Sequence, residues 1–126
     1  GIVVVGAGRT YVINADPADG KVVRQPLDVV LSPRRVTGGA VFRVRAAGKK
    51  EVSTACATAE KYAVDETAFD NAFDLSTPER LYCTELVLKA YRLAGIDLCA
   101  DAEVRHRYLL PRHLLDSALL SAVVRF

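Results

Sequence analysis

The segment Leu81–Gly95 reads LYCTELVLKAYRLAG, and the rest of the chain is best interpreted around it. From Cys83 onward, apolar residues recur every three or four positions, which is the spacing of one helix face. These residues are Leu86, Val87, Ala90, Tyr91 and Ala94. Gly95 follows the last of them, where helices often close with a left-handed residue. The spacing therefore predicts a buried helix that begins at Cys83.

A cysteine at the start of a helix is a candidate nucleophile. Free backbone N–H groups and the positive end of the helix dipole both stabilise a thiolate there. The competing interpretation is a small buried hydrophobe, which is what most free cysteines are. Ser76, Pro78 and Glu79 also have the spacing of a helix start, which would leave Cys83 in mid-helix. We expect a short turn there, then a break, and then the helix from Cys83.

Composition sets limits on the class of protein. A chain of 126 residues with 51% apolar residues can bury the core of a single domain, residues 1–126. No apolar run approaches the roughly 20 residues of a transmembrane helix, so no transmembrane segment is expected. The net charge of +2 is too small to predict a nucleic-acid or anionic-membrane partner. We expect no nucleic acid.

The cysteines are Cys56, Cys83 and Cys99, an odd number with no Cys-x-x-Cys pair. With two histidines, they do not form a zinc pattern, so neither a metal nor another cofactor is expected. Unpaired thiols slightly favour a reducing compartment such as the cytoplasm. Cys56 lies on the apolar side of a predicted helix, which indicates a core residue.

The chain opens with two β-branched runs, 1–5 and 10–15, separated by Gly6, Ala7, Gly8 and Arg9. This pattern predicts a hairpin. The same letters imitate a dinucleotide-binding fingerprint, but Tyr11 stands where its third glycine belongs. A strand follows where that motif requires a helix. We therefore reject nucleotide binding.

The other predicted elements complete an α+β domain around an antiparallel sheet. Strands are expected at 21–25, 40–46 and 122–126, and helices at 26–31, from 49 onward and at 111–120. The helix from residue 49 should bury Val52, Cys56, Ala59 and Ala63. Phe69 and Phe73, four residues apart, predict one helical turn in the connection before Cys83.

The segment 82–87, YCTELV, with Gly95-Ile96 behind it, resembles the permuted NlpC-type papain-like cysteine hydrolases, the YiiX/YebB-like group. In that group a Tyr-Cys-Ser-Glu-Leu-Val segment opens the central helix. The likeness extends to 69–73 (FDNAF), to 20–22 (GKV) and to Leu110-Pro111. It implies a papain-like α+β fold in which the cysteine-bearing helix is central and packs against an antiparallel sheet.

The resemblance also implies a site. Cys83 would be catalytic, and the catalytic histidine would come first, in a Ser-His-x-Gly-Ile pattern whose tail matches Gly1-Ile2. We therefore expect that histidine, and other native residues, upstream of Gly1. Asn14 takes the place of the orienting glutamate. It can accept an imidazole N–H but carries no charge, and a strand-end asparagine beside a turn is the alternative. Tyr82 and Asp70 would bind substrate in the cleft, or else serve as packing and turn residues.

The activity implied by the resemblance is cysteine hydrolase chemistry of the amidase or peptidase type, through a Cys83 thioester. Small peptides, peptidoglycan fragments and lipid-linked acyl groups are the implied substrates. The alternative is a non-catalytic ligand-binding module on the same fold. His106 and His113 follow the cysteine, as in unpermuted papain-like proteins, but their arginine neighbours indicate an exposed basic face instead.

Overall fold

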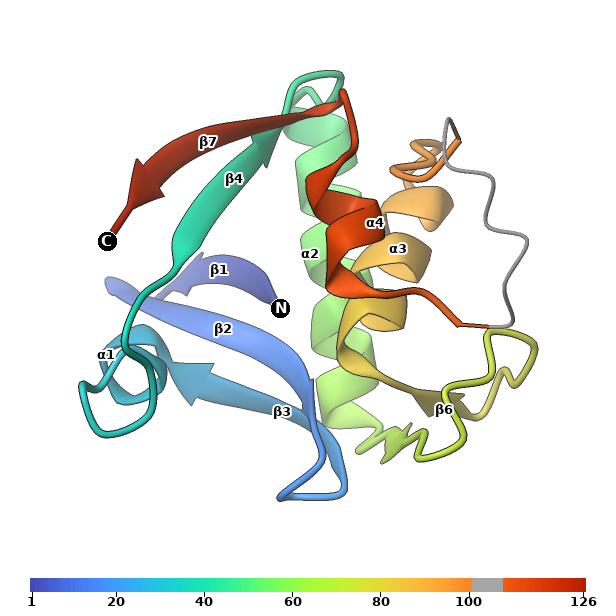
Figure 1. Cartoon of the computed structure of the whole chain (residues 1–126), viewed down its shortest axis with the longest axis horizontal. Coiled ribbons are helices and arrows are strands. Elements are labelled where there is room, and N and C mark those ends of the chain that lie inside the picture. The colour runs from blue at the N-terminus through green and yellow to red at the C-terminus, as the bar shows by residue number, and fades with distance from the viewer. Residues whose placement is uncertain (101–107) are drawn as a thin grey trace.

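The computed structural model describes residues 1–100 and 108–126. Strand β1 (Ile2–Gly6) and strand β2 (Arg9–Asp16) form the predicted hairpin (Figure 1). Ala7 and Gly8 join them with φ of 51° and 73°, and a two-residue turn with positive φ at both positions matches the twist of a hairpin. Strand β3 (Lys21–Pro26) pairs antiparallel with β2 and leads into the short helix α1 (Leu27–Val30), both as predicted.

Strands β5 (Ala68–Phe69) and β6 (Arg80–Leu81) complete a five-stranded sheet in the order β1-β2-β3-β5-β6. β5 pairs antiparallel with β3, whereas β5 and β6 run parallel. The sheet is thus mostly antiparallel, as expected, with one parallel pair at its edge. The helical turn predicted for 69–73 was wrong, because Phe69 belongs to β5 and Phe73 has a φ of 55°.

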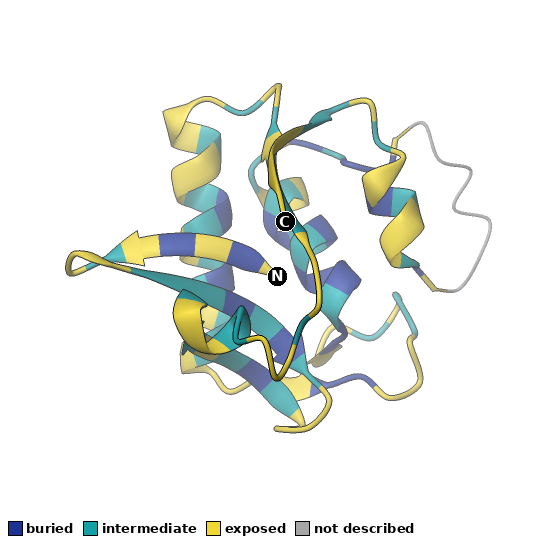
Figure 2. Cartoon of the chain, turned by 60° about the vertical axis from the view of Figure 1, so that its left-hand side comes forward, coloured by how far each residue is buried: buried dark blue, intermediate teal, exposed yellow. Residues whose placement is uncertain are grey.

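Two helices, α2 (Lys49–Val64) and α3 (Cys83–Leu93), pack against each other and against one face of this sheet. Figure 2 shows buried residues concentrated where the helices meet the sheet. α2 begins where predicted, but its buried face is centred on Ala55 and Ala59, and Val52 is 39% exposed. Cys56 is partly buried against the core, as expected. Both helices are thus held by small and aliphatic side chains.

The start and end of α3 are those predicted. It begins at Cys83 and ends before Gly95, whose φ is +86°. The Ile96 N–H donates to Tyr91 O and the Gly95 N–H donates to Arg92 O, each at 2.9 Å. This is the paired hydrogen bonding of a glycine-terminated helix. Leu86, Leu88 and Ala90 are fully buried, so α3 lies at the centre of the core.

Strands β4 (Ala40–Val44) and β7 (Leu120–Arg125) form a separate two-stranded antiparallel sheet, which arches away from the larger one (Figure 1). Helix α4 (Pro111–Leu115) precedes β7. The predicted helix at 111–120 was too long, because the chain turns at Ser117, whose carbonyl accepts the Leu120 N–H at 3.1 Å. β7 also begins at Leu120, two residues earlier than predicted.

The chain is therefore an α+β protein with a curled, mostly antiparallel sheet covered by helices on one face (Figure 1). This architecture is compatible with a papain-like fold. Among the described residues, no helix has both the length and the apolar character needed to cross a bilayer.

Candidate functional site

Cys83 is the first residue of α3 and is half-buried. Tyr82 is the N-cap in extended conformation, and Leu86 N–H donates to Tyr82 O at 3.0 Å, which closes the first helical turn. At this position the backbone N–H of Cys83 has no acceptor within the helix, and the sulfur lies at the positive end of the helix dipole. The arrangement suits a thiolate and a developing oxyanion.

The amino end of β1 faces Cys83. Gly1 and Cys83 are close enough to interact electrostatically. Gly1 is exposed to solvent, but on one side it lies close to β2. A Cβ there would lie 2.7 Å from Ile13 O and 3.3 Å from Asn14 Cβ. Gly1 is therefore a neighbour of both Cys83 and Asn14.

Asn14 lies in β2, opposite Val23 of β3, and is half-buried. Because side chains alternate along a strand, it lies on the opposite face from Ile13 and Ala15, which are fully buried. It is an interior residue of the strand and not the strand end that the sequence indicated as an alternative. A role in orienting a catalytic base stays a prediction.

Two side chains that flank Cys83 hold the backbone of Leu109. The Tyr82 hydroxyl accepts the Leu109 N–H at 2.6 Å, and the Thr84 hydroxyl donates to Leu109 O at 2.6 Å. Tyr82 is only 1% exposed, and burial raises its pKa to about 12. Its ring also packs against Phe73 at a centroid distance of 5.3 Å. Tyr82 therefore has a packing role, and contact with a substrate stays a prediction.

Asp70 is 1% exposed and organises the loop between β5 and β6. Its carboxylate accepts the N–H of Ala72 at 2.9 Å and of Asp74 at 2.7 Å, and the Thr77 hydroxyl at 3.4 Å. These hydrogen bonds satisfy the buried carboxylate, so Asp70 serves as a turn residue. Substrate binding by Asp70 also stays a prediction.

Glu85 lies fully buried in the first turn of α3, where it caps the helix. Its Oε2 accepts the Tyr82 N–H at 3.2 Å. Its Oε1 lies 2.6 Å from Lys89 Nζ, an ion pair in contact but without hydrogen-bond alignment. Burial raises the pKa of Glu85, and Lys89 and the Tyr82 N–H offset this only in part. Sequence reasoning found the capping role of Glu85 but missed Lys89, although the i, i+4 spacing was a signal for it.

The raised pKa of Glu85 predicts a pH-dependent effect of Glu85→Gln. A carboxyl whose folded pKa exceeds its unfolded value stabilises the fold when protonated, and this contribution disappears as pH rises through the folded pKa. Glutamine cannot titrate. We therefore expect the Tm of the wild type minus that of E85Q to fall as the pH rises above about 4, the ordinary pKa of a glutamate. Thermal melts at several pH values measure it, with the exposed Glu79→Gln as control. A difference that does not vary with pH would contradict it.

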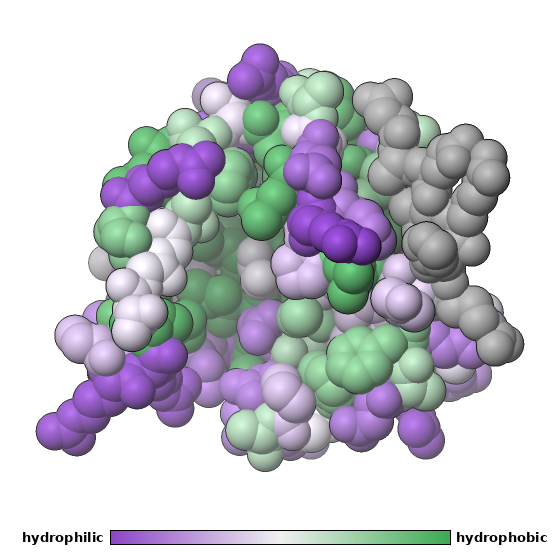
Figure 3. All heavy atoms as spheres, in the orientation of Figure 1, coloured by the Kyte–Doolittle hydropathy of each residue, from purple (hydrophilic) through white to green (hydrophobic). Residues whose placement is uncertain are grey.

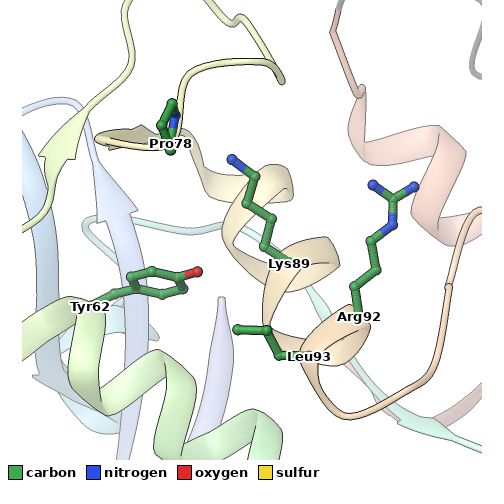
Figure 4. A pocket seen from close by; sticks show the side chains of 5 residues that line it. All are labelled: Tyr62, Pro78, Lys89, Arg92 and Leu93. Atoms are coloured by element: carbon green, nitrogen blue, oxygen red, sulfur yellow. The ribbon is translucent and has the colours of Figure 1, made fainter.

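A surface cavity of about 420 Å³ lies between α2 and α3. Tyr62, Pro78, Lys89, Arg92 and Leu93 line it (Figure 4). Lys89 and Arg92 are already paired, with Glu85 and Asp97 respectively. None of the residues predicted to form the site lines this cavity, so it is not the cleft expected beside Cys83.

The other cysteines and histidines are less suited to catalysis than Cys83. Burial raises the pKa of both Cys56 and Cys99, which makes them poor nucleophiles at neutral pH. His113 is half-buried, and its Nδ1 accepts the Leu110 N–H at 3.1 Å, so it caps α4. His106 lies outside the described residues.

Comparison with known proteins rests on structure. No family model and no curated protein sequence matches the chain. A solved structure, that of the metalloprotein YiiX from Escherichia coli O157:H7, of the group DUF1105, matches with a TM-score of 0.79 at 19% sequence identity. The match covers 100% of this chain and 81% of the YiiX chain. The resemblance to YiiX-like proteins expected from sequence is confirmed at the level of fold: the chain has the fold of YiiX.

Proposed function

We propose that the protein is a cysteine hydrolase of the permuted NlpC-type, papain-like class, with Cys83 as its nucleophile. The observation that carries the proposal is the half-buried sulfur at the first residue of α3, beside the amino end of β1. A buried structural cysteine needs no such position, whereas a thiolate gains from it. The YiiX fold is compatible with this class of enzyme, but a fold does not by itself assign the chemistry.

The proposed reaction is acyl transfer to sulfur followed by hydrolysis. A base takes the Cys83 proton, and the thiolate attacks the carbonyl carbon of an amide or ester. The tetrahedral intermediate collapses and expels the amine or alcohol, which takes up that proton. Water then cleaves the thioester and regenerates the thiol. The Cys83 N–H would stabilise the oxyanion, a contribution of about 3 kcal/mol for a single donor.

The base is proposed to be a histidine encoded two positions before Gly1. Ile2 pairs with Ile13, so a backward extension of β1 in the same register would set that residue opposite Asp16. Its side chain would share a face with Asn14, the diagonal neighbour, and diagonal pairs are within reach of long side chains. Asn14 would then accept the imidazole N–H and orient the ring. The residues encoded before Gly1 test this directly.

The substrate class follows from the resemblance: small peptides, peptidoglycan fragments or lipid-linked acyl groups. YiiX is described as a metalloprotein. Among residues 1–100 and 108–126, no three His, Cys, Asp or Glu side chains come together as metal ligands. The described residues therefore do not fit a metal site, and the reaction is derived without one.

The labelling rate of Cys83 tests the proposal. We expect iodoacetamide at about pH 6 to modify Cys83 at least roughly tenfold faster than N-acetylcysteine, because a free thiol is almost fully protonated there. Mass spectrometry of each cysteine peptide measures the rate. Cys56 and Cys99 serve as slow internal references, and Cys56→Ala leaves the fast site intact. Cys83→Ala and Cys83→Ser should remove fast labelling. A wild-type rate at or below that of the free thiol would overturn the proposal.

A non-catalytic binding module is the second candidate, and two observations favour it. His113 is tied to the cap of α4, and Asn14 supplies no carboxylate. If the encoded upstream residues lack a histidine and labelling is slow, the fold would hold a ligand without cleaving it.

A further inference from the structure

Charge is distributed unevenly along the chain. Segments 29–50 and 117–126 hold seven of the 17 basic residues and none of the 15 acidic ones. These seven are Arg34, Arg35, Arg43, Arg45, Lys49, Lys50 and Arg125. The rest of the chain is correspondingly acidic. The small net charge therefore conceals a strong asymmetry.

The fold brings the two basic segments together. β4 and β7 pair along their length, with Ala40 opposite Arg125. Gly39 and Phe126 exchange two backbone hydrogen bonds of 3.0 Å, which joins the loop before β4 to the end of β7. We call these two segments, 29–50 and 117–126, the basic ribbon.

The cations of the basic ribbon are not neutralised by neighbouring carboxylates. Six ion pairs are found within the described part of the chain, and each uses a cation outside the ribbon. The Arg125 guanidinium instead lies 5.7 Å from the centre of the Phe42 ring. Lys49 and Lys50 begin α2, where the helix dipole disfavours positive charge. An anionic partner would supply the negative charge that these cations lack in the described structure.

Apolar side chains lie exposed among the cations. Val123, Val124 and Phe126 are 54%, 47% and 54% exposed. Val41 pairs with Val124 and Phe42 with Ala122, so Val123 is the extra residue of a β-bulge. A bulge changes the direction of the neighbouring side chains. Figure 3 shows apolar residues on the floor of a hollow beside this ribbon, with hydrophilic, near-neutral and apolar residues along its rim.

We propose that the basic ribbon docks onto an anionic phospholipid bilayer. Arg43 and Arg45, which share one face at the end of β4, contact lipid phosphates, and the exposed valines and Phe126 enter the interface between headgroups and acyl chains. Bilayers attract surfaces that combine basic and apolar side chains in this way. Nucleic acid fits less well, because exposed valines gain nothing on a phosphate backbone and the Phe42 ring is covered by Arg125.

Vesicle flotation tests the proposal with the whole protein. We expect binding to mixed phosphatidylglycerol and phosphatidylcholine vesicles, with little binding to pure phosphatidylcholine. Arg43→Gln with Arg45→Gln should weaken binding roughly 25-fold, about fivefold per residue. Val123→Ser with Val124→Ser should weaken binding at unchanged charge. Arg80→Gln with Arg112→Gln, both exposed and outside the ribbon, is the matched control and should bind nearly as wild type.

Four results would overturn the proposal. They are no binding to the anionic vesicles, an equal loss in the R80Q/R112Q control, tighter binding to duplex DNA or RNA than to vesicles, and a self-associated dimer that buries the ribbon. If circular dichroism shows that R43Q/R45Q is unfolded, Arg34→Gln with Arg35→Gln, in the loop before β4, replaces it. Cys83→Ala should bind vesicles like the wild type, so failure here is distinguishable from failure of the hydrolase proposal.

Discussion

Replacing Asp70 with alanine is expected to lower the free energy of unfolding by about 3 kcal/mol, because three donors lose a buried charged acceptor. The donors are the N–H groups of Ala72 and Asp74 and the Thr77 hydroxyl. Chemical denaturation measures the change, which corresponds to about 10 °C in Tm for a chain of this size.

The controls for Asp70 separate charge from hydrogen bonding. Asp70→Asn keeps one carbonyl acceptor and should cost about half as much. Asp19→Ala removes a carboxylate from an exposed turn and should change stability by less than about 0.5 kcal/mol. If D70A costs no more than D19A, Asp70 does not hold the loop. If D70N also slowed labelling of Cys83, the loop would in addition shape the site.

Replacing Lys89 with methionine is expected to cost about 3 kcal/mol near neutral pH, because it leaves the fully buried Glu85 carboxylate without a counter-charge. The cost should shrink as pH falls, since Glu85, with its raised pKa, then becomes neutral. Denaturant titrations of wild type and K89M at several pH values measure both effects.

The chain provides a matched control for Lys89. Lys61 pairs with Asp65 at 2.6 Å, also four residues apart, but both side chains are more than half exposed. Lys61→Met should therefore cost far less than K89M, because solvent screens an exposed ion pair. Glu85→Gln combined with Lys89→Met should recover most of the stability lost in K89M. A K89M cost that equals the K61M cost, or that the second substitution does not relieve, would contradict this account.

The start of α3 could be predicted from sequence because its determinants are local. Glu85 caps it and Gly95 closes it. The rival helix start at Ser76 does not form, because Ser76 donates to the Asp74 carboxylate at 2.7 Å and belongs to a turn. The β1–β2–β3 meander was predictable for the same reason, since each strand pairs with its neighbour in sequence.

Features that depend on distant residues could not be predicted. Phe69 and Phe73 do contact each other, at a centroid distance of 6.1 Å, but across a turn held by Asp70 and not on a helix. The burial of Tyr82 depends on Leu109, which nothing near Tyr82 in the sequence indicates. The early end of α4 reflects the pairing of β7 with β4, far away in the chain. The helix predicted for 111–120 was therefore too long because tertiary structure overrides the local helical pattern there.

The Ala7–Gly8 turn has a practical consequence for experiments on this protein. It lies at the end of β1 opposite Gly1, about 17 Å along the strand from the end that faces Cys83. Its residues are exposed, and a side chain added at Gly8 would meet no atom within 4 Å. A short epitope or fluorophore-acceptor peptide grafted between Ala7 and Gly8 would therefore report on the molecule without covering the Cys83 thiol.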